Sequence, residues 1–250
     1  MHRHAIIRRW ADLDALNHVN NVRYAEWAKD ALLAAQRDGY LPGGTLWPAT
    51  VTVTYLSPVL LSPERIWVET SFGDDRVIRQ TITEGSGEER VEHATIVTTL
   101  VPEPEAFARP FESDQVYPVL VRRVETASDG RVDYPRMFEY FQEARIFTWW
   151  KAAHKVQAGA FVIGRVQLVI GVPLQWRAEA YDSHTWLSRL GRASADLVSQ
   201  IRDGDRVLAQ ATATLVGFDL QKQTSRPFVA EERAVYESLA PPADTSLLHR

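Results

Sequence analysis

One pattern of residues occurs twice in this chain, in two places far apart. An extended run at residues 6–14 leads through a polar turn into a helical pattern, and a run at residues 119–127 does the same. Three matched pairs share a single offset of 113 positions: Asp12 with Glu125, Val19 with Val132, and Glu26 with Glu139. An internal repeat limits the fold strongly, because each copy has to build the same unit. The chain is therefore predicted to hold two similar domains in tandem.

Both halves show the same order of predicted elements. In the first half, apolar residues recur at the spacing of one helical face between residues 24 and 35. Runs that alternate apolar with polar residues follow the helix, at residues 49–55, 65–72, 77–82 and 91–101. In the second half, a helical pattern at residues 135–150 precedes similar runs at residues 166–170, 185–190, 196–201 and 207–218. Each half is thus predicted to be a strand, a helix and then four antiparallel, half-buried strands.

Proline and acidic residues interrupt these patterns between the two halves, around residues 102–114. We therefore expect four parts: a first domain at residues 1–105, a linker at 106–115, a second domain at 116–220, and a C-terminal tail with a short helix at 221–250.

Composition narrows the classes of function. The chain has 28 basic and 32 acidic residues, and neither sign forms a block that would indicate a nucleic-acid or membrane partner. It has no cysteine, which excludes thiolate metal sites and cysteine nucleophiles and fits a reducing compartment. No segment has the apolar length of a signal peptide or a membrane span. A cytoplasmic protein is the expectation.

Polar groups gather where the first predicted helix begins. Asp12 and Asp14 end the extended run, and His18, Asn20 and Asn21 follow at the helix start. The first backbone N–H groups of a helix are unpaired and lie at the positive end of its dipole. They can stabilise an oxyanion while a nearby carboxylate activates water or attacks a carbonyl. This combination indicates acyl transfer.

The same stretch resembles the signature of the hotdog-fold thioesterases. Its string Asp12-x-Asp14-x-x-x-His18-Val19-Asn20-Asn21-x-x-Tyr24-x-Glu26-Trp27 is similar to that of acyl-CoA thioesterases of the 4-hydroxybenzoyl-CoA thioesterase type and of acyl-ACP thioesterases, where ACP is acyl carrier protein. The resemblance implies an α+β chain of two tandem hotdog folds, each a long central helix wrapped by an antiparallel sheet. In that family two such units pair, and the thioester lies at their interface.

The resemblance also implies roles for single residues. Asp14 would be the catalytic carboxylate, as general base or nucleophile, and the backbone N–H of Asn21 would polarise the thioester carbonyl. His18 and Asn20 would orient water or substrate, and Tyr24 would contribute to substrate binding. No metal ion and no cofactor are expected, because CoA enters only as part of the substrate.

The second repeat departs from this signature. Ala127 occupies the position that matches Asp14, and Arg131 occupies the position that matches His18. That copy is therefore expected to be silent at this site. A carboxylate at a shifted position could still serve in the second repeat, which has three acidic residues nearby: Asp129, Asp133 and Glu143.

Several alternatives stay open at this point. The acyl-ACP enzymes have asparagine two residues after the catalytic aspartate, where this chain has Leu16, so an acyl-CoA thioesterase of lipid metabolism is the first expectation and an acyl-ACP thioesterase the second. A non-catalytic acyl-binding protein is a third, in which Asp14 and Asn21 only satisfy the backbone at a turn. Association into a homo-oligomer is also expected.

Overall fold

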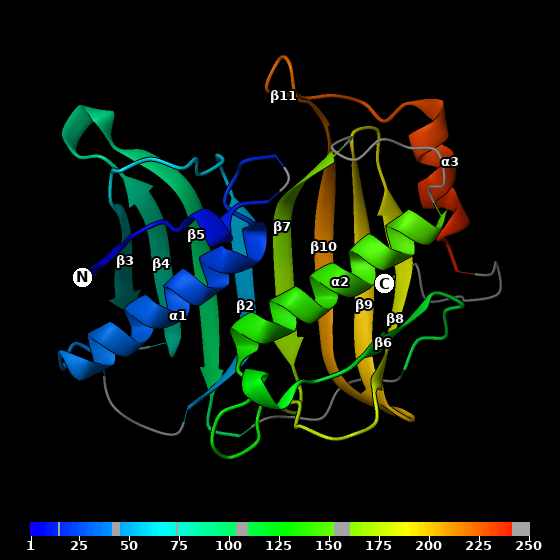
Figure 1. Ribbon diagram of the computed structural model, residues 1–250, viewed down its shortest axis with the longest axis horizontal. Helices are drawn as coiled ribbons and strands as arrows, with labels where there is room; N and C mark the ends of the chain where they lie inside the picture. The colour runs from blue at the N-terminus through cyan, green and yellow to red at the C-terminus, as the bar shows by residue number, and fades with distance from the viewer. Residues whose placement is uncertain (15, 42–45, 74, 104–109, 153–160, 242–250) are drawn as a thin grey trace. The chain divides into compact units, whose positions relative to one another are not determined.

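The structure of the chain is a computed structural model, which describes residues 1–14, 16–41, 46–73, 75–103, 110–152 and 161–241. The chain divides into two compact units, Met1–Glu105 and Ala106–Arg250. In each unit a long helix lies across one face of an antiparallel sheet (Figure 1).

The described part of the first unit has five strands. They are β1 (His2–Ile6), β2 (Trp47–Tyr55), β3 (Ile66–Phe72), β4 (Val77–Glu84) and β5 (Val91–Val101). Their order across the sheet is β1-β3-β4-β5-β2, and each neighbouring pair is antiparallel. Short 3₁₀ turns lie at Trp10–Asp12 and Gly87–Glu89.

Helix α1 (Asn21–Arg37) packs on this sheet through one apolar stripe. The stripe has helical spacing, and its buried members include Tyr24, Trp27, Ala28, Ala31 and Ala35. Fully buried valine and isoleucine side chains cover the facing side of the strands: Val51, Val53, Ile66, Val68, Ile82 and Ile96. Burying each such side chain contributes roughly 1.5–3 kcal/mol, so the helix is held mainly by this apolar contact.

The end of α1 is fixed by its backbone. Gly39 has a φ of +72°, the left-handed conformation that glycine adopts at low cost. Its N–H donates to the carbonyl of Gln36, and the N–H of Tyr40 donates to the carbonyl of Ala35 (2.8 Å). These two bonds form a Schellman motif, which satisfies carbonyls that the helix leaves unpaired.

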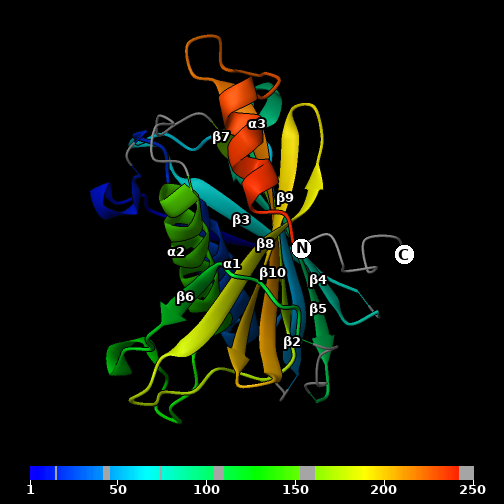
Figure 2. The same ribbon diagram turned by 90° about the vertical axis from the view of Figure 1, so that its right-hand side faces the viewer.

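The second unit repeats this arrangement. Its sheet order is β7-β10-β9-β8-β6, from strands β6 (Val116–Val119), β7 (Phe161–Ile170), β8 (Tyr181–Leu190), β9 (Ser194–Asp203) and β10 (Arg206–Asp219). The short β11 (Thr224–Ser225) pairs with β10. Helix α2 (Tyr134–Ala152) crosses the sheet, and α3 (Ala230–Ser238) follows the last strand (Figure 2).

The backbone before each long helix follows the offset of the repeat. Leu13 bridges to Val19 in the first unit, as Thr126 bridges to Val132 in the second. The residues at the tip of the turn match as well, because Asn17 and Gly130 both have positive φ, +59° and +79°. The prediction of two tandem hotdog folds is therefore confirmed.

The extended runs predicted before the helices are shorter than expected. Strand β1 ends at Ile6, so the prediction of a strand that runs to Asp14 was wrong. The chain turns instead at Trp10–Asp12, where Asp12 Oδ2 accepts from the N–H of Arg9 (2.8 Å). The second unit has the same turn at Arg123–Glu125. An alternating pattern does not reveal a turn that a side chain closes in this way.

Two segments outside the predicted domain cores pack on the second unit. Phe111 stacks on Trp186 with ring centroids 4.3 Å apart, so the described end of the expected linker covers part of the sheet. Tyr236 of α3 is fully buried, with its ring 4.6 Å from that of Trp149. Residues 104–109 and 242–250, which include most of the expected loose tail, lie outside the described residues.

Candidate active site

Asp14 is half-buried in a tight turn between the first 3₁₀ turn and α1. Its backbone N–H donates to the carbonyl of His18 (2.7 Å). Its carboxylate oxygen Oδ1 accepts from the backbone N–H groups of Leu16 (2.8 Å) and His18 (3.2 Å). Within the described part of the chain, Oδ2 has no hydrogen-bond partner. One carboxylate oxygen is thus held in place, and the other is available to a ligand.

The start of α1 presents an unpaired N–H group beside this turn. Asn20 is the N-cap, and its side chain accepts from the N–H of Val22 (3.3 Å). Its carbonyl accepts from the N–H of Arg23 (2.9 Å). The N–H of Asn21, the first residue of the helix, has no acceptor among the described residues. This N–H is a donor at the positive end of the helix dipole.

His18 is held by its backbone rather than by its ring. Its carbonyl accepts from the N–H of Asp14, and its N–H donates to Asp14 Oδ1. No hydrogen bond joins the imidazole to any described residue. Both ring nitrogens are therefore available to a water molecule or a substrate. The sequence prediction placed Asp14, His18, Asn20 and Asn21 together, and the structure brings all four to one turn, with the Asn20 oxygen engaged in the helix cap.

Tyr24 lies one helical turn further along α1 and is 3% exposed. Its hydroxyl oxygen accepts from the N–H of Val59 (3.1 Å). Burial raises the pKa of Tyr24 to about 12; the bond from Val59 opposes this increase, and the charge of Asp14 adds to it. Tyr24 is therefore neutral at ordinary pH and keeps a proton that it can donate.

A loop between β2 and β3, the 56–65 loop, lies against the turn that holds Asp14. The carbonyl of Val59 accepts from the N–H of Val19 (2.8 Å), and Leu60 forms an antiparallel bridge with His18. No local sequence pattern marks this loop, because its pairing joins residues about 40 positions apart in the chain.

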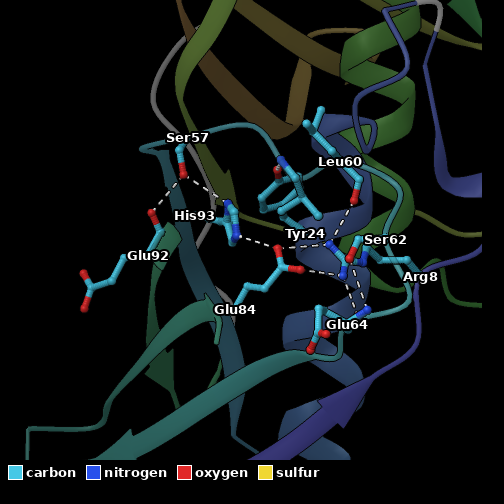
Figure 3. Close-up of polar contacts among 10 residues, drawn as sticks. Arg8, Tyr24, Ser57, Leu60, Ser62, Glu64, Glu84, Glu92 and His93 are labelled. Atoms are coloured by element: carbon cyan, nitrogen blue, oxygen red, sulfur yellow. Dashed lines mark hydrogen bonds and ion pairs between the residues drawn. The ribbon is translucent and has the colours of Figure 1, made fainter. Parts of the chain in front are cut away.

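Arg8 anchors the 56–65 loop from inside the first unit (Figure 3). Its side chain is 0% exposed. The guanidinium donates to the carbonyls of Leu60 (2.9 Å) and Glu64 (2.5 Å), and to both carboxylate oxygens of Glu84 (2.6 and 3.1 Å). One sequence signal could have found it: Arg8 continues the inward-facing alternation of Ile6, and a buried arginine requires a charged partner.

Glu84 extends this network to His93 and Ser57 (Figure 3). Glu84 Oε2 lies 3.3 Å from His93 Nε2, and His93 Nδ1 lies 3.0 Å from Ser57 Oγ. Partial burial raises the pKa of the Glu84 carboxyl, but Arg8 and His93 more than offset this, so the pKa lies below its usual value. Glu84 is therefore the ionised counterion of Arg8.

The matching turn of the second unit differs in its polar groups. Ala127 has no carboxylate to offer where Asp14 stands in the first unit. The N–H of Tyr134, which matches that of Asn21, donates to Asp133 Oδ1 (2.9 Å). Asp129 Oδ1 accepts from the N–H of Arg131 (3.0 Å). Asp129 and Asp133 thus each pair with a backbone N–H close by, and Glu143 is exposed on α2.

Two classes of feature are not found in the part of the chain that the structure describes. None of its helices combines the length and apolar character that a membrane span needs. No cluster of three or more histidine, aspartate or glutamate side chains there has a geometry that could hold a metal ion.

Comparisons with known sequences link the first unit to one family. Residues 1–61 match the family described as acyl-ACP thioesterase C-terminal domain. This stretch includes the turn that holds Asp14 and all of α1. None of the curated proteins matches the chain significantly.

Solved structures resemble the chain over most of its length. A 12:0-ACP thioesterase from Umbellularia californica has a TM-score of 0.66 at 10% identity, covering 86% of this chain and 96% of its own. An acyl-ACP thioesterase from Bacteroides thetaiotaomicron VPI-5482 has a TM-score of 0.58 at 7% identity, covering 85% and 96%. Identities this low establish the fold alone, and that fold is the tandem hotdog arrangement described above.

Proposed function

We propose that the chain is a thioester hydrolase that cleaves an acyl thioester to a free acid and a thiol. One observation carries the proposal: a carboxylate with one fixed and one free oxygen lies in the same turn as an unpaired helix-start N–H. Asp14 supplies the carboxylate, and Asn21 supplies the N–H. The family match over residues 1–61 supports the same chemistry.

In the proposed reaction, Asp14 Oδ2 takes a proton from water as the water oxygen attacks the thioester carbonyl. The Asn21 N–H stabilises the oxyanion of the tetrahedral intermediate, aided by the helix dipole. Collapse of the intermediate breaks the carbon–sulfur bond, and the proton passes from Asp14 to the departing thiolate. His18 orients the water, Asn20 shapes the helix start, and Tyr24 lies beside the bound substrate. No metal ion or cofactor takes part.

Direct attack by Asp14 on the carbonyl is the alternative to general-base catalysis. A single turnover in water enriched in ¹⁸O tests for the alternative. General-base catalysis places the label only in the free acid. Label in the Asp14 carboxylate would show direct attack, with thiolate leaving first and water then opening the mixed anhydride at the Asp14 carbonyl.

For the carrier, acyl carrier protein now has the stronger support. The matched family and two structures that cover most of this chain are acyl-ACP thioesterases by description. The expectation of CoA rests on a single departure, Leu16, and stays untested. Acyl-CoA hydrolysis is therefore the second candidate.

Release of free thiol from matched acyl-ACP and acyl-CoA substrates tests both proposals. We expect hydrolysis of both substrates, with a higher kcat/KM for the ACP thioester. A higher kcat/KM for acyl-CoA would reverse the choice of carrier. Binding of acyl chains without release of thiol from either carrier would contradict the enzyme and favour an acyl-binding protein.

A further inference from the structure

We propose that Arg8 is a positioning residue for the candidate active site, acting through the 56–65 loop. This inference rests on the function proposed above. Arg8 does not belong to the turn that holds Asp14, and its guanidinium touches that turn only through the loop, so it is not a catalytic residue.

The contacts of Arg8 fix two points of the loop at once. Nη1 donates to the carbonyl of Leu60 (2.9 Å), and Nη2 donates to the carbonyl of Glu64 (2.5 Å). The planar fork of an arginine can hold two such acceptors in a fixed geometry, which a lysine cannot do. Because the side chain is fully buried, water does not compete for these bonds.

The fixed loop in turn holds the backbone beside Asp14. Leu60 bridges to His18, whose N–H is one of the two donors to Asp14 Oδ1. The N–H of the neighbouring Val59 donates to the hydroxyl of Tyr24 (3.1 Å). A displacement of the loop would therefore move His18, and with it one of the two N–H donors that hold the Asp14 carboxylate.

Glu84 and His93 support Arg8 from the opposite side. The bidentate contact with Glu84 balances the charge of the buried guanidinium, and the distance of 3.3 Å between His93 Nε2 and Glu84 Oε2 limits the freedom of that carboxylate. The charge pair keeps the guanidinium aimed at the loop carbonyls.

The second repeat shows that the fold does not need an arginine at this place. Val121 occupies the matching position and is 2% exposed. The loop pairing still forms there, because the N–H of Val132 donates to the carbonyl of Leu174 (2.8 Å) and Arg131 bridges to Gln175. The arginine thus occurs in the copy that has Asp14, and an apolar residue occurs in the copy that lacks it.

Arg8→Lys is the central test, since it keeps the charge opposite Glu84 and loses the fork. Arg202→Lys is the matched control in the second unit. Arg202 is also a buried arginine, with its side chain 4% exposed, and it donates to the carbonyl of Phe111 and to Gln200 Oε1 (3.0 Å). Both variants are compared with the parent for kcat, KM and backbone amide exchange.

We expect Arg8→Lys to lower kcat about tenfold or more with KM within about twofold, because small displacements of reacting groups cost rate steeply. The amides of Val19 and Val59 should exchange faster. Arg202→Lys should leave kcat and these two amides as in the parent. The double variant Arg8→Met/Glu84→Gln removes both charges and places an apolar side chain where the second copy has Val121. It should fold and show at least the same loss of kcat.

Three results would overturn the inference: unchanged kcat in both Arg8 variants, equal losses in Arg8→Lys and Arg202→Lys, or unchanged exchange at Val19 and Val59. A parent protein without thioester hydrolysis would instead overturn the proposed function. The amide exchange still tests the link from Arg8 to the loop in that case, so the two failures are distinguishable.

Discussion

The turns before α1 and α2 have nearly the same backbone and different polar groups. Asp14 N donates to the His18 carbonyl at 2.7 Å, and Ala127 N donates to the Arg131 carbonyl at 2.9 Å. The first turn combines a carboxylate with an unpaired helix N–H, while in the second the carboxylate is absent and Asp133 caps the matching N–H. The hotdog backbone therefore builds the turn, and a few side chains decide whether it can do chemistry.

The largest effect is expected from the N–H of Asn21. Proline suits the first position of a helix, and the preceding Asn20 has φ −57° and ψ 135°, which a following proline accepts. Asn21→Pro therefore removes the N–H and keeps the helix. Loss of one oxyanion donor typically lowers kcat by about 10²- to 10³-fold. Asn21→Ala, which keeps the N–H, should stay within a few-fold of the parent in steady-state hydrolysis. Equal rates for the two variants would exclude this N–H as a donor.

Substitution of Arg8 should lower the free energy of unfolding more than substitution of its counterpart Val121. Arg8→Met leaves Glu84 without its counterion, and breaking a buried ion pair costs roughly 3–5 kcal/mol. Val121→Ala removes two buried carbon groups at about 0.8 kcal/mol each. Urea unfolding of both variants measures the difference, and adding Glu84→Gln to Arg8→Met should recover part of the loss. A single Arg8→Met variant as stable as the parent would mean that Glu84 is solvated.

The pH dependence of stability should reflect ionisation of the Tyr24 hydroxyl. Its counterpart in the second unit, Met137, does not titrate. The pKa of Tyr24 rises from 10.0 to about 12 in the folded chain. A raised folded pKa gives stability that is complete below about pH 10 and is lost as the pH rises toward 12. The effect is on the order of 2 kcal/mol. The difference in unfolding free energy between the parent and Tyr24→Phe should therefore shrink over this interval, and a constant difference would contradict the assignment.

The smallest effect is expected at the tips of the two turns. Gly130 has a φ of +79°, and a Cβ added there would meet no heavy atom within 4 Å, so Gly130→Ala should cost about 1 kcal/mol from backbone strain alone. Asn17 already has a side chain at φ +59°, so Asn17→Gly should change stability by only a few tenths of a kcal/mol. Thermal unfolding of both variants measures this, and a larger cost at Asn17 would show that its side chain contributes more than its backbone.

Much of the fold could be predicted because its signals are local or periodic. The offset of 113, the helical stripe of α1 and the alternation of the strands each follow from side-chain spacing. The turn at Trp10–Asp12 was missed because a side-chain cap, rather than hydropathy, creates it. The packing of Phe111 on Trp186 was missed because it joins residues that are distant in sequence.

The sequence predicted the acidic and amide groups of the candidate site. It did not predict the residues that support them. Asp14, His18, Asn20 and Asn21 lie within eight positions, so a single motif reveals them. Arg8 and Glu84 are 76 positions apart, and only the fold brings them together.

If the first repeat carries the chemistry through Asp14, the hydrolysis rate should depend on this carboxylate, which Asp14→Asn removes. Asparagine keeps the shape of the side chain and the acceptor for the N–H groups of Leu16 and His18, so the fold should be unchanged. We expect kcat to fall about a hundredfold or more, while Asp129→Asn and Asp133→Asn stay within a few-fold of the parent. Normal hydrolysis by Asp14→Asn, with loss in Asp129→Asn or Asp133→Asn, would place the working carboxylate in the second repeat and contradict the account.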